Sequence, residues 1–303
     1  MDTDEITRDV YKGEGPNGID LRLYDTGGKK LPSVTTVLKT RDDDKSNLYA
    51  WQDRNDGEGD NAYHEHLFWY SRHIGTLGHW YALKNLDDTL DWSNDEEQSK
   101  NELHYQQASE VRNDSPREVL YSIVKSQHGV ESWGEFYDRY QPYKNGKYYR
   151  DELVSQAERD IGFFVDGQSR LWSKLDIGPA DTIAVEKFLF NEEFGYAGQV
   201  DLVYEDPSNG DIVVADLKSS SGCYDKHKIQ GAAYGKAIEL AEDVPVESVD
   251  RLEVHRAHPR SGQMAVHTSS ETATHDVHTT QYWDESFEDL WGRFEDLVTD
   301  FDY

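Results

Sequence analysis

Asp201, Asp216 and Lys218 have the residue types and spacing of a candidate metal site. Asp216 and Lys218 lie two residues apart, so on a β-strand both side chains would point from the same face. Two carboxylates and an ammonium are costly to place near a core unless they hold a metal ion. The alternative is a solvated strand face in an acidic chain. The apolar run at residues 212–215 favours the metal site, because it gives both faces of its strand the character of a central strand.

The segments that carry these three residues predict a tight β-hairpin. Residues 197–204 alternate between polar and apolar side chains, and residues 212–218 form a second run rich in β-branched side chains. Between them, residues 207–210 read Pro-Ser-Asn-Gly, a cluster of residues that favour turns.

Two registers of this hairpin are open. A turn centred on residues 208–209 would place Asp201 opposite Asp216, whereas a type I′ turn centred on residues 209–210 would place Asp201 opposite Lys218. Opposed residues have Cβ atoms roughly 5 Å apart and diagonal neighbours roughly 7–8 Å. Either register therefore brings the three side chains together.

The elements around the hairpin predict an α/β protein with a helical N-terminal region. Residues 61–175 follow mostly helical spacing and are rich in aromatic residues, most of which we interpret as core and interhelical packing. From about residue 181 the period changes to that of strands. Further strands are predicted at residues 182–190, 251–257 and 264–268, further helices after Ser33 and at residues 45–55, 225–239 and 283–301, and a loop at residues 269–280.

Composition limits the number of domains and indicates the cellular environment of the protein. The chain has 303 residues, enough for one large domain or two modest ones, and its 31 basic and 60 acidic residues give a net charge of −29. The acidic residues are dispersed, as on proteins of a hypersaline cytoplasm. At about 1 M salt the Debye length falls to about 3 Å, which screens such self-repulsion. Acidity therefore indicates the habitat of the protein more than its partner. An acidic protein is ordinarily a poor candidate for binding nucleic acid, and the screening weakens this objection but does not remove it.

Several other classes of protein are excluded or disfavoured. Cys223 is the only cysteine, which excludes a disulfide framework, an all-cysteine zinc site and a four-cysteine iron–sulfur cluster. The N-terminus lacks the pattern of a signal peptide, and no apolar stretch approaches the roughly 20 residues that span a bilayer. We expect a soluble, cytoplasmic protein without membrane partners, in a hypersaline, archaeal-type host cell and either cellular or virus-encoded.

Histidines suggest a zinc site only weakly. The segment His64-Glu65-His66 and the pair His255 and His258 have suitable types, but no cysteine accompanies them, and we interpret them as surface or loop residues. The chain also lacks the helicase P-loop Gly-x-x-x-x-Gly-Lys-[Ser/Thr]. A fused motor is therefore not expected.

Four further residues fit the predicted hairpin. Glu186 lies in the strand before it and would reach the same site if that strand pairs with the one that carries Asp201. Gln230 and Tyr234 are one helical turn apart, so both can face the sheet from the helix after Lys218, unless they simply pack beneath it. His79 follows Gly-Thr-Leu-Gly at a predicted helix start; without that context it would equally be an ordinary core or surface histidine.

These motifs, taken in order, resemble those of the RecB branch of the PD-(D/E)XK nucleases. The matching segments are Gly-Thr-Leu-Gly-His79, Glu186, Gly-Gln-Val-Asp201, Asp216-Leu-Lys218 and Gln230-Gly-Ala-Ala-Tyr234. The segment Leu-Pro-Ser-Val-Thr-Thr-Val-Leu at residues 31–38 and a closing helix begun by Gln-Tyr-Trp at residues 281–283 are similar to those of the mitochondrial genome maintenance exonuclease group and its phage and viral relatives. The resemblance spans about residue 31 to the C-terminus and is weak between residues 85 and 175.

The resemblance implies a hard-cation centre. Asp201 and Asp216 would bind one or two Mg²⁺ or Mn²⁺ ions, with the backbone carbonyl of Leu217 as a further ligand. His79 would be an additional ligand, which slightly favours Mn²⁺. No iron–sulfur cluster is expected, because the cysteines of that branch are missing.

The remaining motif residues would act around this centre. Lys218 would orient or activate the attacking water and neutralise phosphate charge. Glu186 would be a further catalytic residue, although its role varies among relatives. Gln230 and Tyr234 would support the site or bind the DNA backbone.

The resemblance also implies a fold and a function. The fold is a restriction-endonuclease-like mixed β-sheet flanked by helices at residues 176–303, preceded by a mainly helical region with short N-terminal strands at residues 1–175 that covers the active site. The activity is metal-dependent hydrolysis of DNA, most simply as an exonuclease on single strands or strand ends in replication, recombination or repair, with replication or recombination proteins as partners. Helices within residues 61–160 would form an arch that admits a free DNA end.

Two other functions stay open. A structure-selective or recombination endonuclease would use the same core, and linear and circular substrates would distinguish it. An acidic DNA mimic that binds the DNA site of another protein would need charge arrayed on one face and no metal centre. The dispersed acidic residues and the complete set of site residues disfavour the mimic.

Overall fold

The computed structural model describes the protein at residues 7–11, 21–25, 29–41, 74–86, 115–119, 131–132, 135, 150–220, 222–259, 261–269 and 280–301. The helix predicted at residues 45–55, most of the aromatic region and the arch predicted within residues 61–160, and nearly all of the loop predicted at residues 269–280 lie outside these residues. In the described part, Trp80, Tyr81 and Trp172 are buried, which confirms them as packing residues.

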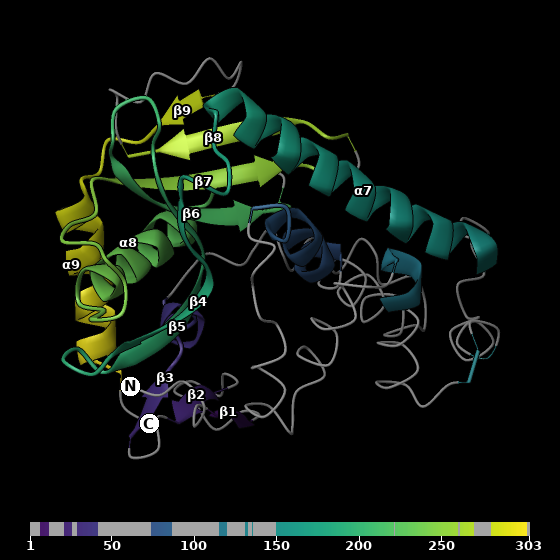
Figure 1. Ribbon diagram of the computed structural model, residues 1–303. Helices are drawn as coiled ribbons and strands as arrows, with labels where there is room; N and C mark the ends of the chain where they lie inside the picture. Colours follow the sequence, from purple (N-terminus) through teal and green to yellow (C-terminus); the bar gives the residue numbers. More distant parts are fainter. Residues whose placement is uncertain are drawn as a thin grey trace.

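A six-stranded mixed sheet forms the centre of the molecule (Figure 1). Its strands lie side by side in sequence order: β4 (Thr182–Asn191), β5 (Tyr196–Glu205), β6 (Ile212–Lys218), β7 (Arg251–Ala257), β8 (Met264–Thr268) and β9 (Thr280–Tyr282). The pairs β4/β5, β5/β6 and β7/β8 are antiparallel, whereas β6/β7 and β8/β9 are parallel. The chain is therefore a mixed α/β protein, as predicted at that level.

Helix α8 (Asp225–Glu239) makes the crossover between the parallel strands β6 and β7 and has the bounds that the sequence predicts. Small buried residues such as Ala232, Ala233 and Gly235 line the helix, so that it approaches the sheet closely. The Nδ1 of His227 accepts the Tyr224 N–H at 3.2 Å and so ties the first turn to the residue before it. The backbone N–H of a helix start is otherwise left without an intrahelical partner.

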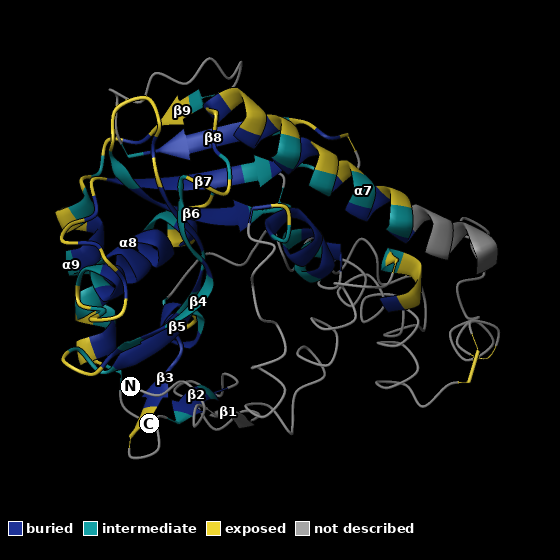
Figure 2. Cartoon of the chain, in the orientation of Figure 1, coloured by how far each residue is buried: buried dark blue, intermediate teal, exposed yellow. Residues whose placement is uncertain are grey.

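The two faces of the sheet are covered by different helices (Figure 2). On one face, α8 packs with α1 (Val34–Leu38) and α9 (Phe287–Thr299) over a core that includes Val203, Val214 and Leu252. On the other face, α7 (Arg150–Leu175) and the helix at residues 74–83 cover a core that includes Leu202, Ala215 and Leu217. None of the described helices, the long α7 included, is both long and apolar enough to cross a membrane.

A second, antiparallel sheet lies at the N-terminal side, formed by β1 (Thr7–Tyr11), β2 (Leu21–Asp25) and β3 (Lys30–Pro32). Short N-terminal strands are therefore present as predicted. Ser33 joins this sheet to the main one through a parallel bridge to Ala197. Its side chain also accepts the Thr36 N–H at 3.1 Å, which confirms it as the N-cap of α1.

The end of the chain differs from its predicted form. Gln281 and Tyr282 belong to β9, and α9 begins only at Phe287, where Ser286 and Asp289 form a capping box. The sequence prediction of a helix from Trp283 is therefore wrong by one turn. The apolar spacing continues through Trp283, but the cap at Ser286 sets the start of the helix.

Strands β4 and β5 bend together next to the predicted site. In a regular strand, residues two apart point to the same face, yet Val200 packs in the core under α8 and Leu202 packs in the core under α7. On the facing strand, Glu186 has a φ of 46°, a left-handed conformation that is costly for residues other than glycine. Strands β4 and β5 consequently curve away from β6 at this point (Figure 1).

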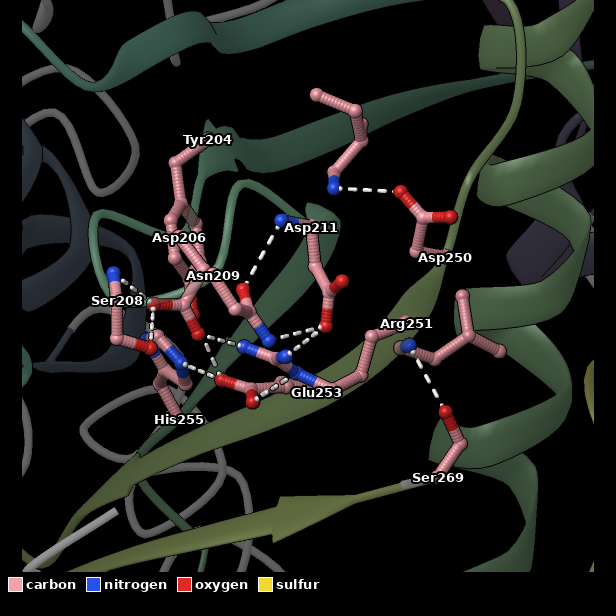
Figure 3. Close-up of polar contacts among 12 residues, drawn as sticks. Tyr204, Asp206, Ser208, Asn209, Asp211, Asp250, Arg251, Glu253, His255 and Ser269 are labelled. Carbon is pink, nitrogen blue, oxygen red and sulfur yellow. Dashed lines mark hydrogen bonds and ion pairs between the residues drawn. The ribbon is translucent and has the colours of Figure 1, made fainter. Parts of the chain in front are cut away.

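A buried polar network lies at the start of β7 and the β5–β6 turn (Figure 3). Arg251 is paired with Asp206, with Asp211 at 2.7 Å and with Glu253 at 2.8 Å. Glu253 also accepts hydrogen bonds from the Tyr204 hydroxyl at 2.9 Å and from His255 Nε2 at 2.7 Å. We refer to these residues as the Arg251 network.

His255 is a correction to the sequence analysis. It lies in the centre of β7 and is fully buried, rather than at the surface or in a loop. Its Nδ1 accepts the indole N–H of Trp172 at 3.2 Å, so its Nε2 carries the proton donated to Glu253. Spacing to His258 alone could not show this, because one partner, Trp172, comes from α7 and the other, Glu253, lies two residues earlier on the same face of β7.

Candidate metal centre

The register of the hairpin decides between the two predicted arrangements. Leu202 pairs with Ala215 and Glu205 with Ile212, so the turn is centred on residues 208–209. Asp201 consequently lies level with Asp216. On the other side, Val185 pairs with Leu202, which brings Glu186 level with Asp201. Three acidic residues from three neighbouring strands therefore meet at one place in the sheet.

Asp201 is held by the backbone of the neighbouring strand. Its Oδ2 accepts the N–H of Leu217 at 2.7 Å and lies 3.7 Å from His79 Nδ1. Leu217 thus contacts a site carboxylate through its N–H. The sequence analysis predicts its carbonyl, not its N–H, as a metal ligand. Burial raises the pKa of Asp201, while Lys218 and the Leu217 N–H partly oppose this rise.

His79 reaches the site from the helix at residues 74–83. It lies within that helix, one turn after its first described residue, and not at the helix start. Its ring stacks on Phe164 of α7, with centroids 5.4 Å apart and an interplanar angle of 21°. A Cβ on Gly78 would lie 2.7 Å from the same Phe164 ring, so the glycine allows this close approach.

The His79 imidazole is neutral at neutral pH. Burial and the nearby Lys218 ammonium lower its pKa from 6.5 to about 3, although Asp216 acts in the opposite direction. A neutral imidazole has a free nitrogen lone pair, which is the form that binds metals. The histidine is therefore poised as a ligand rather than as a cation.

Glu186 completes a group of potential ligands. One ligand atom each of His79, Glu186 and Asp201 lies within 4.8 Å of the other two, and this is the one such group among the described residues. Gln199 stabilises the unusual backbone of Glu186 by donating its side-chain N–H to the Glu186 carbonyl at 3.1 Å. Opposed ligands of Mg²⁺ lie roughly 4.2 Å apart, twice its ligand distance of about 2.1 Å. A small contraction would therefore fit the group to such an ion.

Asp216 and Lys218 form a buried ion pair beside this group. Lys218 Nζ lies 2.6 Å from both carboxylate oxygens of Asp216. Its geometry suits a hydrogen bond only to Oδ1, so the buried Oδ2 has no hydrogen-bond partner among the described residues. Burial, with Asp201 nearby, raises the pKa of Asp216 to about 6 in spite of Lys218.

Lys218 is positively charged in this arrangement. Burial alone would lower the pKa of its ammonium, but Asp216 and Asp201 outweigh burial and raise it. A protonated lysine can donate hydrogen bonds and stabilise negative charge, but it cannot accept a proton. Its chemistry in the site is therefore that of a fixed cation.

Gln230 and Tyr234 support the strand that carries Asp201. The Gln230 side chain donates to the Tyr234 hydroxyl at 2.9 Å, and both residues are buried on α8. The Tyr234 ring packs on Gly198, where a Cβ would lie 2.5 Å from Tyr234 Cε1. The Gly-Gln-Val-Asp motif thus has a structural reason for its glycine. The contacts described for Gln230 and Tyr234 are with the protein itself.

The donor set fits a hard divalent cation. Carboxylate oxygens with one imidazole suit Mg²⁺ or Mn²⁺, and Asp216 adds an oxygen that has no hydrogen-bond partner in the described part of the chain. The raised pKa values of the two aspartates show that Lys218 does not compensate their charge fully. A divalent cation would supply that missing positive charge.

The sequence analysis missed two contributors to the site. Phe164 positions the imidazole of His79, and Gln199 holds the backbone of Glu186. Gln199 lies within the Gly-Gln-Val-Asp motif and could have been found there. Phe164 gives no signal, because it is one of many apolar residues in a long amphipathic helix.

The chain was compared with protein-family models and with curated proteins, and neither comparison found a match. The resemblance to PD-(D/E)XK nucleases therefore rests on the motif residues of the sequence alone.

Proposed function

We propose that this protein is a metal-dependent nuclease that hydrolyses phosphodiester bonds of DNA and acts as an exonuclease on single strands or strand ends. The observation that carries the proposal is the group formed by His79, Glu186 and Asp201, with the Asp216–Lys218 ion pair beside it. Carboxylates from three strands and a neutral imidazole can together bind Mg²⁺ or Mn²⁺, and the Lys218 ammonium beside them can bind a phosphate oxygen.

Bound Mg²⁺ or Mn²⁺ would neutralise phosphate charge and lower the pKa of a water molecule. His79, Glu186, Asp201 and Asp216 would hold one or two such ions. Lys218 keeps its proton and would donate to a phosphate oxygen, which stabilises the negative charge that develops during hydrolysis. Gln230 and Tyr234 keep β5 in position, so they act on Asp201 rather than on the substrate.

The proposal includes a restriction-endonuclease-like core at residues 176–303. The order of motif residues along β4, β5, β6 and α8 supports it, as does the mixed sheet with helices on both faces. Residues 1–175 would form the mainly helical cover of this core. The contact of His79 with Phe164 of α7 supports such a cover, because both residues precede the core.

Cellular context follows from composition and resemblance alone. A net charge of −29 suits a protein, encoded by the cell or by a virus, that works in the cytoplasm of a hypersaline cell. Replication or recombination proteins would be its partners there. High salt screens the repulsion between such a surface and DNA, and metal ions bridge carboxylates to phosphates at contact. The preferred conditions for an assay are therefore molar KCl with Mg²⁺ or Mn²⁺.

Digestion of end-labelled DNA tests this function. Linear single strands, linear duplexes and covalently closed single-stranded circles are incubated with the protein in molar KCl with Mn²⁺, beside Lys218→Gln and the exposed control Lys174→Gln on α7. We expect the wild type and Lys174→Gln to degrade linear strands and Lys218→Gln to lose at least about 100-fold in rate. Circles should survive.

Other results would assign the protein differently. Rapid cutting of circles would identify an endonuclease on the same core. Absence of cleavage with every divalent metal would contradict the nuclease proposal. In that case an unchanged affinity of Asp216→Ala for a protein partner would favour the acidic DNA mimic.

A further inference from the structure

Basic residues continue from Lys218 along the same face of the sheet. Lys218 pairs with Arg256 on the parallel strand β7, and Asp216 pairs with Val254. Val254 in turn pairs with His267 on β8. Paired residues of neighbouring strands point to the same face. Arg256 and His267 therefore lie on the face that carries Asp216 and Lys218, one and two strands away from them.

Helix α8 adds two more basic residues over this face. His227 is buried in its first turn, and Lys228 follows it. Lys228 Nζ lies 2.8 Å from Glu285 and 5.7 Å from the centre of the Trp283 ring. The side chains of Lys218 and Lys228 each keep 20% of their surface exposed, so solvent reaches both ends of the group.

The pKa values of His267 and His227 respond to the basic side chains around them. Burial, together with the charges of Arg256 and Lys228, lowers the pKa of His267 to about 4. Burial, together with the charges of Lys218, Lys226 and His267, lowers the pKa of His227 to about 3. Three basic side chains, Lys218, Lys228 and Arg256, thus gather on one face of a chain with 60 acidic and 31 basic residues, and two of them are paired with Asp216 and Glu285.

His267 provides a second, independent observation. Its side chain is 7% exposed, and its Nε2 is buried without a hydrogen-bond partner among the described residues. A buried polar atom left unpaired is rare in folded proteins and destabilises them. A ligand that offers a hydrogen-bond acceptor or donor would satisfy it. Next to two cations, the suitable ligand is an anion with several oxygens.

We propose that Arg256, Lys228 and His267 form a phosphate-binding subsite next to the metal centre, which holds the backbone phosphate adjacent to the one that is cleaved. The inference rests on the proposed nuclease function. Neighbouring strands are about 4.8 Å apart, so the subsite begins one strand away from Lys218. Arg256 provides a planar fork suited to two phosphate oxygens, and neutral His267 donates or accepts a hydrogen bond. The subsite would fix the direction and register of the DNA strand.

Substrates with one neutral phosphate test the subsite. A methylphosphonate replaces each phosphate near the cleaved bond of a linear single strand in turn, and kcat/KM is measured with Mn²⁺ in molar KCl. With the wild type, one substitution beside the cleaved phosphate should reduce kcat/KM by about 10- to 100-fold, as expected for a charge-assisted hydrogen bond. With Arg256→Gln, the native substrate should show that loss and the methylphosphonate should add little to it.

Controls separate this coupling from general damage. Lys174→Gln removes an exposed lysine of α7, on the opposite face of the sheet, and should behave as the wild type. If circular dichroism shows that Arg256→Gln fails to fold, Lys228→Gln and His267→Gln can each be combined with the methylphosphonate substrates in the same way. The subsite would be overturned if the loss in kcat/KM caused by each variant simply added to the full loss caused by a methylphosphonate at every position.

The inference can also fail separately from the nuclease function. If no metal supports cleavage, the affinity for the same oligonucleotides is measured by fluorescence anisotropy without metal. Weaker binding by Arg256→Gln than by Lys174→Gln would support the subsite without catalysis, provided that this difference in affinity disappears on the oligonucleotide with the same methylphosphonate. Equal affinities of the two variants would overturn it.

Discussion

The candidate metal centre and the Arg251 network lie in the same sheet, yet they differ in how their charges are satisfied. The metal centre takes its acidic residues from β4, β5 and β6, with Asp216 and Lys218 at the carboxyl end of β6. The network lies at the amino end of β7, with residues of β7 facing α7 (Figure 3). In the network, Arg251 has three carboxylate partners and Glu253 has three donors. In the metal centre, Asp216 keeps an oxygen without a hydrogen bond among the described residues.

Their pKa values diverge accordingly. Although burial opposes it, hydrogen bonds from Ser208 and Arg251 lower the pKa of Asp206 in the network. Burial raises the pKa of Asp216 and lowers that of His79 in the metal centre. Folding thus stabilises the charges of Asp206 and Arg251 in the network, whereas in the metal centre it destabilises the charges of Asp201 and Asp216 and stabilises that of Lys218. This difference supports the proposed role of the metal centre beyond stability.

Removal of Arg251 should have the largest effect on stability. Arg251→Met leaves Asp206 and Glu253 buried without their cation, which should reduce the free energy of unfolding by about 3–5 kcal/mol. Chemical denaturation in molar KCl measures this loss. The exposed control Lys174→Met should change stability by less than about 0.5 kcal/mol. A loss below about 1 kcal/mol for Arg251→Met would contradict the role assigned to the network.

The contribution of Asp216 to stability should depend on pH in the opposite sense to that of Asp206 in the network, because folding raises one pKa and lowers the other. Folding raises the pKa of Asp216 from 3.8 to about 6, so this group stabilises the metal-free protein below about pH 4 and that contribution is lost as the pH rises through 6. Asp216→Asn, which stays neutral, should remove this part of the pH dependence. We expect it to be more stable than the wild type at pH 8 by about 1–3 kcal/mol and equal near pH 4.

Denaturation curves of both proteins between pH 4 and pH 8, recorded with a chelator in molar KCl, provide the measurement. The difference between the two proteins isolates Asp216 from the many other acidic residues. A variant that is less stable than the wild type at pH 8 would show that the carboxylate stabilises the fold, as in the Arg251 network.

A smaller effect is expected at the glycine that faces Tyr234. Gly198→Ala forces the Tyr234 ring away from β5 and should reduce stability by about 1–2 kcal/mol, because the site is tightly packed. It should also weaken Mn²⁺ binding, since β5 carries Asp201. The control Gly292→Ala in α9 meets no atom within 4 Å and should be neutral or stabilising. Calorimetric melting of both variants compares them.

Local patterns account for the parts of the fold that the sequence predicts well. The alternation around Asp201 and the Pro-Ser-Asn-Gly turn limited the hairpin to two registers, and the apolar spacing of α8 set both of its ends. The N-cap at Ser33 follows from a similarly local rule. These features depend on residues within a few positions of one another.

Contacts between distant segments account for what could not be predicted. Glu186 reaches Asp201 through a left-handed backbone that no pattern in β4 indicates. His255 is buried because Trp172 and Glu253 satisfy both of its nitrogens. The approach of His79 to Asp201 depends on the packing of its helix against Phe164. The sequence suggested which residues form the site, but its geometry depends on these long-range contacts.

Manganese binding tests the central claim most directly. Free Mn²⁺ is titrated by electron paramagnetic resonance in molar KCl, which suppresses binding to the acidic surface, for the wild type, Asp201→Asn and the control Asp211→Asn of the Arg251 network. We predict one or two bound ions for the wild type and for Asp211→Asn, and at least a tenfold weaker affinity for Asp201→Asn. Equal binding by all three proteins, or binding by none, would contradict a metal centre at this site.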